Sequence, residues 1–131
     1  MAFNYGAALA AFLASSAVPG TTVQTQSVEM FASVPIIEPA MLKGLMASPT
    51  HFVLVDVRQP DEFAAGHIEG AMLMPLDSLA DSYAQLPRDV KLIVYCRSGH
   101  RSAQAVSFLR AHGYDGAVSL AGGFLAWTAT K

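Results

Sequence analysis

Short apolar runs alternate with polar, helix-favouring segments from about residue 35 to the end of the chain. The runs at 52–57 (FVLVDV) and 92–95 (LIVY) are continuous and of strand length. Continuous apolar runs of this length are typical of strands that are covered on both faces of a parallel sheet. Residues 117–120 and 71–74 are weaker candidate strands.

Helices are expected between these strands. Residues 39–47, 76–86 and 102–112 are candidates, and the last ends before Gly113, a favourable residue just beyond a helix. A further helix is expected to begin at Pro60, because proline followed by two acidic residues suits a first helical turn. Strands that alternate with helices predict an α/β domain with a mainly parallel sheet.

The N-terminal part of the chain differs in composition from the rest. Residues 1–40 contain two acidic residues and no lysine or arginine, and residues 7–17 (AALAAFLASSA) are small and apolar. This apolar stretch is too short to span a bilayer, and it resembles a signal peptide except that no basic residue precedes it. We therefore divide the chain into an extension, residues 1–34, and a domain, residues 35–131.

Three roles are open for the extension: packing on the domain or forming a short helix, export, or anchoring at a membrane surface. We expect no stable membrane insertion and a cytoplasmic location. The alternative is an exported or periplasmic protein, if residues 1–17 act as a signal.

Composition excludes several classes of protein. The 131 residues suffice for one domain, and with 53% hydrophobic and 14% charged residues the chain is not intrinsically disordered. A net charge of −2 leaves no positive excess for phosphates, so no nucleic-acid partner is expected. One cysteine allows neither an intrachain disulfide nor an all-cysteine metal site, and no metal or cofactor is expected.

The single cysteine, Cys96, lies where a predicted buried strand ends, which is where open α/β sheets bind ligands. A turn with Ser98 and Gly99 can direct several backbone N–H groups at one point, and the next helix adds its positive end. Arg97 and Arg101 add two positive charges. All these features favour thiolate over thiol and predict a low pKa for Cys96. The same features would hold an anionic substrate over the sulfur.

Three segments resemble, in order, the motifs of the rhodanese (sulfurtransferase) family. Residues 56–71 contain DVR, EF and GHIEGA, which are similar to the first family signature. Residues 96–102 (CRSGHRS) resemble the active-site loop, and residues 122–127 (GGFLAW) resemble the C-terminal signature. The resemblance covers residues 36–128 and implies a single domain built on a twisted parallel sheet, with helices on both faces.

The resemblance also implies a function. It makes Cys96 the catalytic nucleophile, which takes a sulfane sulfur as a persulfide, with sulfite leaving when thiosulfate is the donor. Arg97, at the second position of the loop, is similar to the residue of thiosulfate-using members. The acceptor stays open between cyanide and a thiol such as glutathione, a thioredoxin-like protein or another protein. The residues expected to bind the small anionic donor are those that follow the cysteine: Arg97, Ser98, Gly99, His100, Arg101 and Ser102.

Residues near the first motif are expected to support the loop without contacting substrate. Asp56 and Arg58 lie at the end of a central strand. There they should order the helix that begins at Pro60, most simply as a salt bridge. We expect His67 to be a hydrogen-bonded structural histidine rather than a base.

Two other functions are weighed against sulfur transfer. Cysteine-based phosphatases and arsenate reductases also place a cysteine in an anion-binding loop before an arginine. Four residues separate Cys96 from Arg101, whereas tyrosine-phosphatase-type loops have one residue more. The shorter loop favours a site that holds sulfur. A non-catalytic, partner-binding domain of the same fold would be expected to lack the cysteine.

Overall fold

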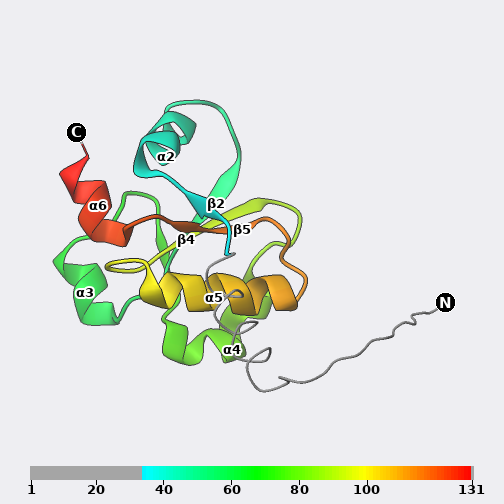
Figure 1. Cartoon of the computed structure of the whole chain (residues 1–131). Helices are drawn as coiled ribbons and strands as arrows, with labels where there is room; N and C mark the ends of the chain where they lie inside the picture. Colours follow the sequence, from blue (N-terminus) through cyan, green and yellow to red (C-terminus); the bar gives the residue numbers. More distant parts are fainter. Residues whose placement is uncertain (1–33, 131) are drawn as a thin grey trace, which may run out of the picture. The chain divides into compact units, whose positions relative to one another are not determined.

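Five short parallel strands form the centre of the computed structural model, which describes residues 34–130 (Figure 1). Apart from Val34, the expected N-terminal extension lies outside these residues. Every pair of neighbouring strands is parallel. The spatial order is β1-β5-β4-β2-β3. The strands are β1 (Ile36–Ile37), β2 (Phe52–Asp56), β3 (Met72–Leu73), β4 (Lys91–Tyr95) and β5 (Ala117–Leu120).

Helices cover both faces of the sheet. Helices α4 and α5 pack on one face and α2 and α6 on the other (Figure 1). The fold class expected from the sequence is thereby confirmed. Within residues 34–130, no helix has the length and hydrophobicity needed to cross a membrane. The helices are α2 (Pro39–Met46), α3 (Pro60–Ala65), α4 (Leu79–Ser82), α5 (His100–Ala111) and α6 (Gly123–Ala129).

The continuous apolar runs of the central strands follow from this covering. Val55 and Val94 belong to the apolar cluster beneath α5, whereas Leu54 and Ile93 belong to the cluster beneath α2 and α6. Successive side chains of a strand point to opposite faces, so a strand that is covered on both sides needs apolar residues at every position. All four side chains are at most 4% exposed.

The segment 76–86 differs from its prediction as one helix. It consists of a 3-10 turn (Leu76–Ser78), the short helix α4 and a second 3-10 turn (Tyr83–Gln85). The hydroxyl of Tyr114 donates to the backbone oxygens of Tyr83 and Leu86 at 2.8 and 3.0 Å. In a helix over 76–86 these carbonyls would be among the last four, which have no intrahelical donor, and Pro87 offers no N–H to Tyr83. The bonds from Tyr114 therefore hold the end of the segment in place of helical hydrogen bonds.

Two further differences concern short elements. Strand β1 has two residues, too few for an apolar pattern to predict, and it forms through pairing with β5. Helix α5 begins at His100, two residues before the predicted start. The reason is Gly99, whose φ of 110° turns the chain into the helix.

Candidate active site

The loop between β4 and α5 holds the cysteine. Cys96 directly follows β4, which is paired with β2 on one side and β5 on the other. The cysteine side chain is 1% exposed. Because two neighbouring strands hold β4 in place, the sulfur has a fixed position at the carboxyl edge of the sheet.

Hydrogen bonds to the sulfur come from the loop and from the first turn of α5. The N–H of Gly99 donates to Cys96 Sγ at 3.0 Å and the N–H of Ser102 at 3.4 Å. The Ser102 hydroxyl oxygen lies 3.6 Å from the sulfur. Burial raises the pKa of the Cys96 thiol, but hydrogen bonds from the Ser102 hydroxyl and from the Ser102, Gly99 and Ser98 N–H groups outweigh burial. The net pKa is below its ordinary value, in the direction expected from the sequence.

The first residues of α6 hold the carbonyl groups of the same loop. The N–H of Phe124 donates to the oxygen of Cys96 at 2.8 Å, and the N–H of Leu125 to that of Arg97 at 3.0 Å. A Cβ on Gly123 would lie 2.6 Å from the Cys96 oxygen and from the carbonyl atoms of Arg97. Only glycine therefore permits this approach. With its carbonyls bound to α6, the loop presents its N–H groups to the sulfur.

Arg101 forms an ion pair with a residue that the sequence analysis did not assign to the site. Its Nη1 and Nη2 donate to Oε1 and Oε2 of Glu62, in α3, at 2.8 and 3.0 Å. Glu62 Oε1 also accepts the N–H of Gln59 at 2.9 Å, which completes a capping box at the start of α3. The predicted substrate-binding arginine is thus held against α3 by a two-point contact.

This ion pair predicts a pH-dependent contribution to stability. The hydrogen bond from Arg101, followed by that from the Gln59 N–H, lowers the pKa of Glu62 to about 2. A carboxyl group whose pKa is lowered by folding stabilises the protein at pH values above its ordinary pKa. This stabilisation is lost as the pH falls toward the folded-state pKa. Glu62→Gln should therefore reduce the free energy of unfolding by about 1 kcal/mol at neutral pH, as expected for a partly exposed pair. The measurement is urea unfolding of both proteins from pH 7 to pH 2. An unchanged difference at pH 2 would contradict the assignment.

The salt bridge expected between Asp56 and Arg58 is present and buried. Arg58 Nη2 lies 2.7 Å from Asp56 Oδ2, and the two residues are 4% and 0% exposed. The same nitrogen donates to the oxygen of Gly66 at 2.7 Å, and the guanidinium lies 4.6 Å from the centre of the Phe124 ring. This pair therefore connects the end of β2 with the end of α3 and with α6.

The remaining predicted residues lie at the surface. His67 stacks on Phe63 with 3.7 Å between ring centres, and its Nδ1 lies 2.9 Å from the Phe63 oxygen. These contacts fit the expected structural role. Arg97 and Ser98 are exposed on the Cys96 loop, and His100 is exposed at the first position of α5. Within residues 34–130, the guanidinium of Arg97 forms no ion pair, so its charge is available at the loop.

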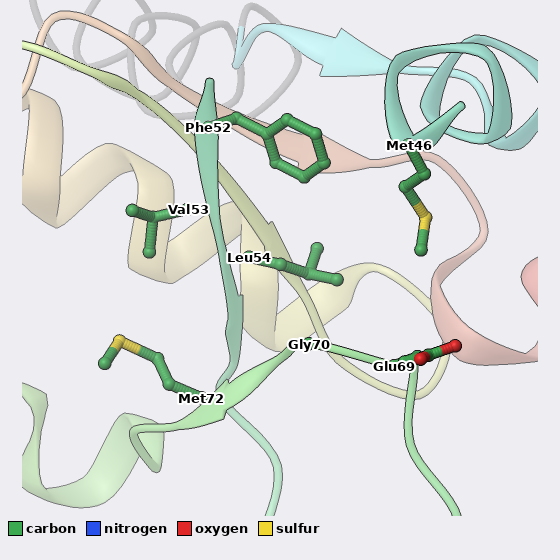
Figure 2. A pocket seen from close by; sticks show the side chains of 7 residues that line it. All are labelled: Met46, Phe52, Val53, Leu54, Glu69, Gly70 and Met72. Atoms are coloured by element: carbon green, nitrogen blue, oxygen red, sulfur yellow. The ribbon is translucent and has the colours of Figure 1, made fainter. Parts of the chain in front are cut away.

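A pocket of about 310 Å³ lies away from this loop, at the start of β2 (Figure 2). Phe52 and Leu54 line it from one side of the strand and Val53 from the other (Figure 2). Glu69 supplies a carboxylate to a wall that is otherwise mainly apolar. No residue assigned to the site by sequence contributes to this pocket. Among residues 34–130, no three His, Cys, Asp or Glu side chains are grouped to hold a metal ion.

Sequence reasoning missed two features of the site. It did not identify Glu62 as the partner of Arg101, and no local pattern could have done so. It placed Gly123 in a motif without assigning its close approach to the Cys96 loop. Paired glycines that open a helix beside a ligand site often mark a close approach of two backbones, and they could have indicated this contact.

Comparisons with known proteins agree with this geometry. The family model for the rhodanese-like domain matches residues 38–130. A sulfurtransferase of Allochromatium vinosum is 36% identical over 91 residues, which cover 70% of this chain and 85% of that protein. The thiosulfate sulfurtransferase GlpE of Ectopseudomonas mendocina is 41% identical over 78 residues, which cover 60% and 72%.

A solved structure shows the same likeness. The human single-domain sulfurtransferase TSTD1 superposes with a TM-score of 0.66 at 30% identity, over 76% of this chain and 99% of that one. Residues 38–130, which the family model matches, include all of the Cys96 loop and the helices that hold it. On the family model and these relatives together, the chain belongs to the rhodanese-like domain family.

Proposed function

We propose that this protein is a thiosulfate sulfurtransferase that carries sulfur as a persulfide on Cys96. The observation that carries the proposal is the set of donors around the cysteine, with the Gly99 and Ser102 N–H groups 3.0 and 3.4 Å from the sulfur. Such donors stabilise a thiolate, the nucleophilic form of cysteine. Thiosulfate as donor is supported by the likeness to GlpE and by the exposed Arg97 beside the nucleophile.

In the first step, the Cys96 thiolate attacks the outer sulfur of thiosulfate. The sulfur–sulfur bond of thiosulfate breaks, its electron pair leaves with sulfite, and a persulfide forms on the cysteine. In the second step, cyanide or a thiolate acceptor attacks the outer sulfur of this persulfide. The persulfide bond breaks, the acceptor leaves as thiocyanate or as a new persulfide, and the Cys96 thiolate is restored. The two steps need no further oxidant or reductant.

The direct test is the intact mass of the protein before and after incubation with thiosulfate. We expect a gain of one sulfur atom, which is lost again on addition of cyanide. Protein alkylated at Cys96 beforehand is the control and should gain nothing. Because Cys96 is the single cysteine of the chain, the added atom has one thiol to occupy. An unchanged mass would contradict sulfur transfer and favour a non-catalytic, partner-binding domain.

Arg97→Ala should weaken thiosulfate binding. Arg97 is exposed on the loop and carries a charge that could bind the anionic donor. We expect kcat/KM to fall about ten- to hundredfold, mainly through a higher KM, as happens when binding that is equal in ground and transition states is lost. Arg97→Lys, which keeps the charge, is the matched control and should recover part of the loss. Unchanged steady-state kinetics in Arg97→Ala would remove the basis for choosing thiosulfate as donor.

Phosphate chemistry is the main alternative, and the position of Arg101 disfavours it. A phosphoryl group in transfer spreads its charge over three equatorial oxygens, each of which needs donors. Here Glu62 takes one N–H from Nη1 and one from Nη2 of Arg101 and holds the guanidinium. The segment between Cys96 and Arg101 also has one residue, and so one backbone N–H, fewer than a tyrosine-phosphatase-type loop. The wild-type protein should therefore hydrolyse aryl phosphates negligibly in an assay run beside thiosulfate consumption. Efficient hydrolysis would favour the phosphatase.

A further inference from the structure

Two of the buried polar side chains are linked to the cysteine by short polar contacts. Among residues 34–130, Asp56, Arg58, Ser102 and Ser119 are the buried polar or charged residues. The first two form the salt bridge described above. Ser102 and Ser119 are 0% and 3% exposed, and their hydroxyl oxygens lie 2.8 Å apart. Burying a hydroxyl is costly unless it is hydrogen-bonded, so a serine inside β5 calls for a physical reason.

The register of the sheet explains why Ser119 reaches the site. Ser119 is paired with Val94 of β4, and directly paired residues point to the same face of a sheet. Cys96 follows Val94 by two positions, so its side chain also points to that face. Helix α5 covers this face and brings Ser102 between the other two. Ser102 contacts both of the others: its Oγ lies 2.8 Å from Ser119 Oγ and 3.6 Å from Cys96 Sγ.

The Ser102 hydroxyl has one proton and three acceptors within reach. These are the Cys96 sulfur, the Gly99 oxygen at 3.3 Å and Ser119 Oγ. A bond to the thiolate requires that Ser102 donate to the sulfur and not to the other two. If the Ser119 hydroxyl donates to Ser102 Oγ, it cannot accept the Ser102 proton. The remaining competitor, the Gly99 oxygen, already accepts the N–H of Ala103 at 3.2 Å and is a weaker acceptor than a charged thiolate. The two hydroxyls then form a chain that points toward the sulfur, and each bond polarises the next.

We propose that Ser119 is a positioning residue for the Cys96 thiolate: its hydroxyl donates to Ser102 Oγ and thereby directs the Ser102 proton to the sulfur. This inference rests on the proposed function only in taking Cys96 as the reactive thiolate. It assigns to β5 a polar role in the site, beneath the loop. Substrate does not contact Ser119, which acts entirely through Ser102.

The test is the pH dependence of alkylation at Cys96 in the full-length chain. Iodoacetamide reacts with the thiolate, and the chain has a single cysteine, so the rate against pH reports the pKa of this thiol. We expect Ser119→Ala to raise that pKa by about half a unit. The shift is small because Ser119 only strengthens the charge-assisted bond from Ser102 to the thiolate, and this strengthening is a fraction of the energy of that bond. Ser102→Ala should raise it further. The measurement needs no sulfur donor, so it is independent of whether thiosulfate is the substrate.

A double-mutant cycle separates positioning from a merely structural effect. If Ser119 acts through Ser102, then Ser119→Ala should cause no further shift in the Ser102→Ala background. Ser107→Ala is the matched control: Ser107 lies on α5, makes no side-chain hydrogen bond within residues 34–130, and should leave the pKa unchanged. The basic residues of the loop and of the first turn of α5, which are Arg97, His100 and Arg101, are the same in every variant.

Two outcomes would overturn the proposal. One is an unchanged alkylation profile in Ser119→Ala. The other is a full shift from Ser119→Ala when Ser102 is already alanine, which would show that the effect does not pass through Ser102. Thermal unfolding of each variant checks that the fold is retained. Because Ser119→Ala removes one oxygen atom from a strand, the sheet should persist.

Discussion

Replacing Cys96 by serine is expected to abolish sulfur transfer and to leave the fold intact. In the proposed reaction, the cysteine sulfur is both the nucleophile and the atom that carries the transferred sulfur. A serine hydroxyl is not ionised near neutral pH and cannot hold a sulfane sulfur. The hydroxyl can still accept the N–H groups of Gly99 and Ser102, which now meet the sulfur at 3.0 and 3.4 Å, so no buried donor is left unpaired.

The measurement for Cys96→Ser is sulfite release from thiosulfate in the presence of cyanide, together with thermal unfolding. We expect release at the background rate and a melting temperature close to that of the wild type. Sulfite release above background would show that another residue carries the reaction.

The second large effect is expected from Gly123→Ala, far from Cys96 in sequence. The new methyl group would lie 2.6 Å from the Cys96 oxygen and from the carbonyl carbon and oxygen of Arg97. These are backbone atoms, so no side chain can rotate away. The loop or α6 must shift, which breaks the bonds from Phe124 and Leu125 to the loop carbonyls. Because displacements of about 1 Å can cost a hundredfold in rate, we expect kcat/KM to fall by about that factor or more.

A matched control is available one residue earlier. Gly122 also has a positive φ, 72°, but its added Cβ would lie 2.5 Å from the Cβ of Ala126, within α6 itself. The double variant Gly122→Ala/Ala126→Gly removes that clash. It should lose about 2–3 kcal/mol of stability, through the left-handed conformation at 122 and the glycine placed inside α6, and keep most of its activity. Steady-state kinetics and chemical unfolding of both variants make the comparison. Equal losses of activity would mean that a general defect in α6, and not contact with the loop, is responsible.

The central strands were predicted from the sequence more accurately than the segment 76–86. Strands β2 and β4 were predicted to within a residue, because strands buried on both faces leave continuous apolar runs. The weaker candidate strand at 117–120, which contains Ser119, has the bounds of β5. The segment 76–86 was predicted wrongly as one helix. Its apolar spacing suits a helix, whereas in the structure the end of the segment is held by the Tyr114 hydroxyl, which binds the Leu86 and Tyr83 carbonyls from 28 and 31 residues away. No local window contains that partner.

The amino-acid sequence by itself determined the architecture and singled out Cys96 as the candidate nucleophile. The sequence around Cys96 is a buried strand followed by a glycine-containing turn and a helix. The hydrogen bonds to the sulfur can be predicted from this segment alone, because the N–H donors and the sulfur lie within seven residues. Only the tertiary structure decided what holds that loop. Arg101 meets Glu62 across 39 positions of sequence, and Ser102 meets Ser119 across 17. Such contacts depend on which strands become neighbours and in what register, and spacing along one segment does not encode that information.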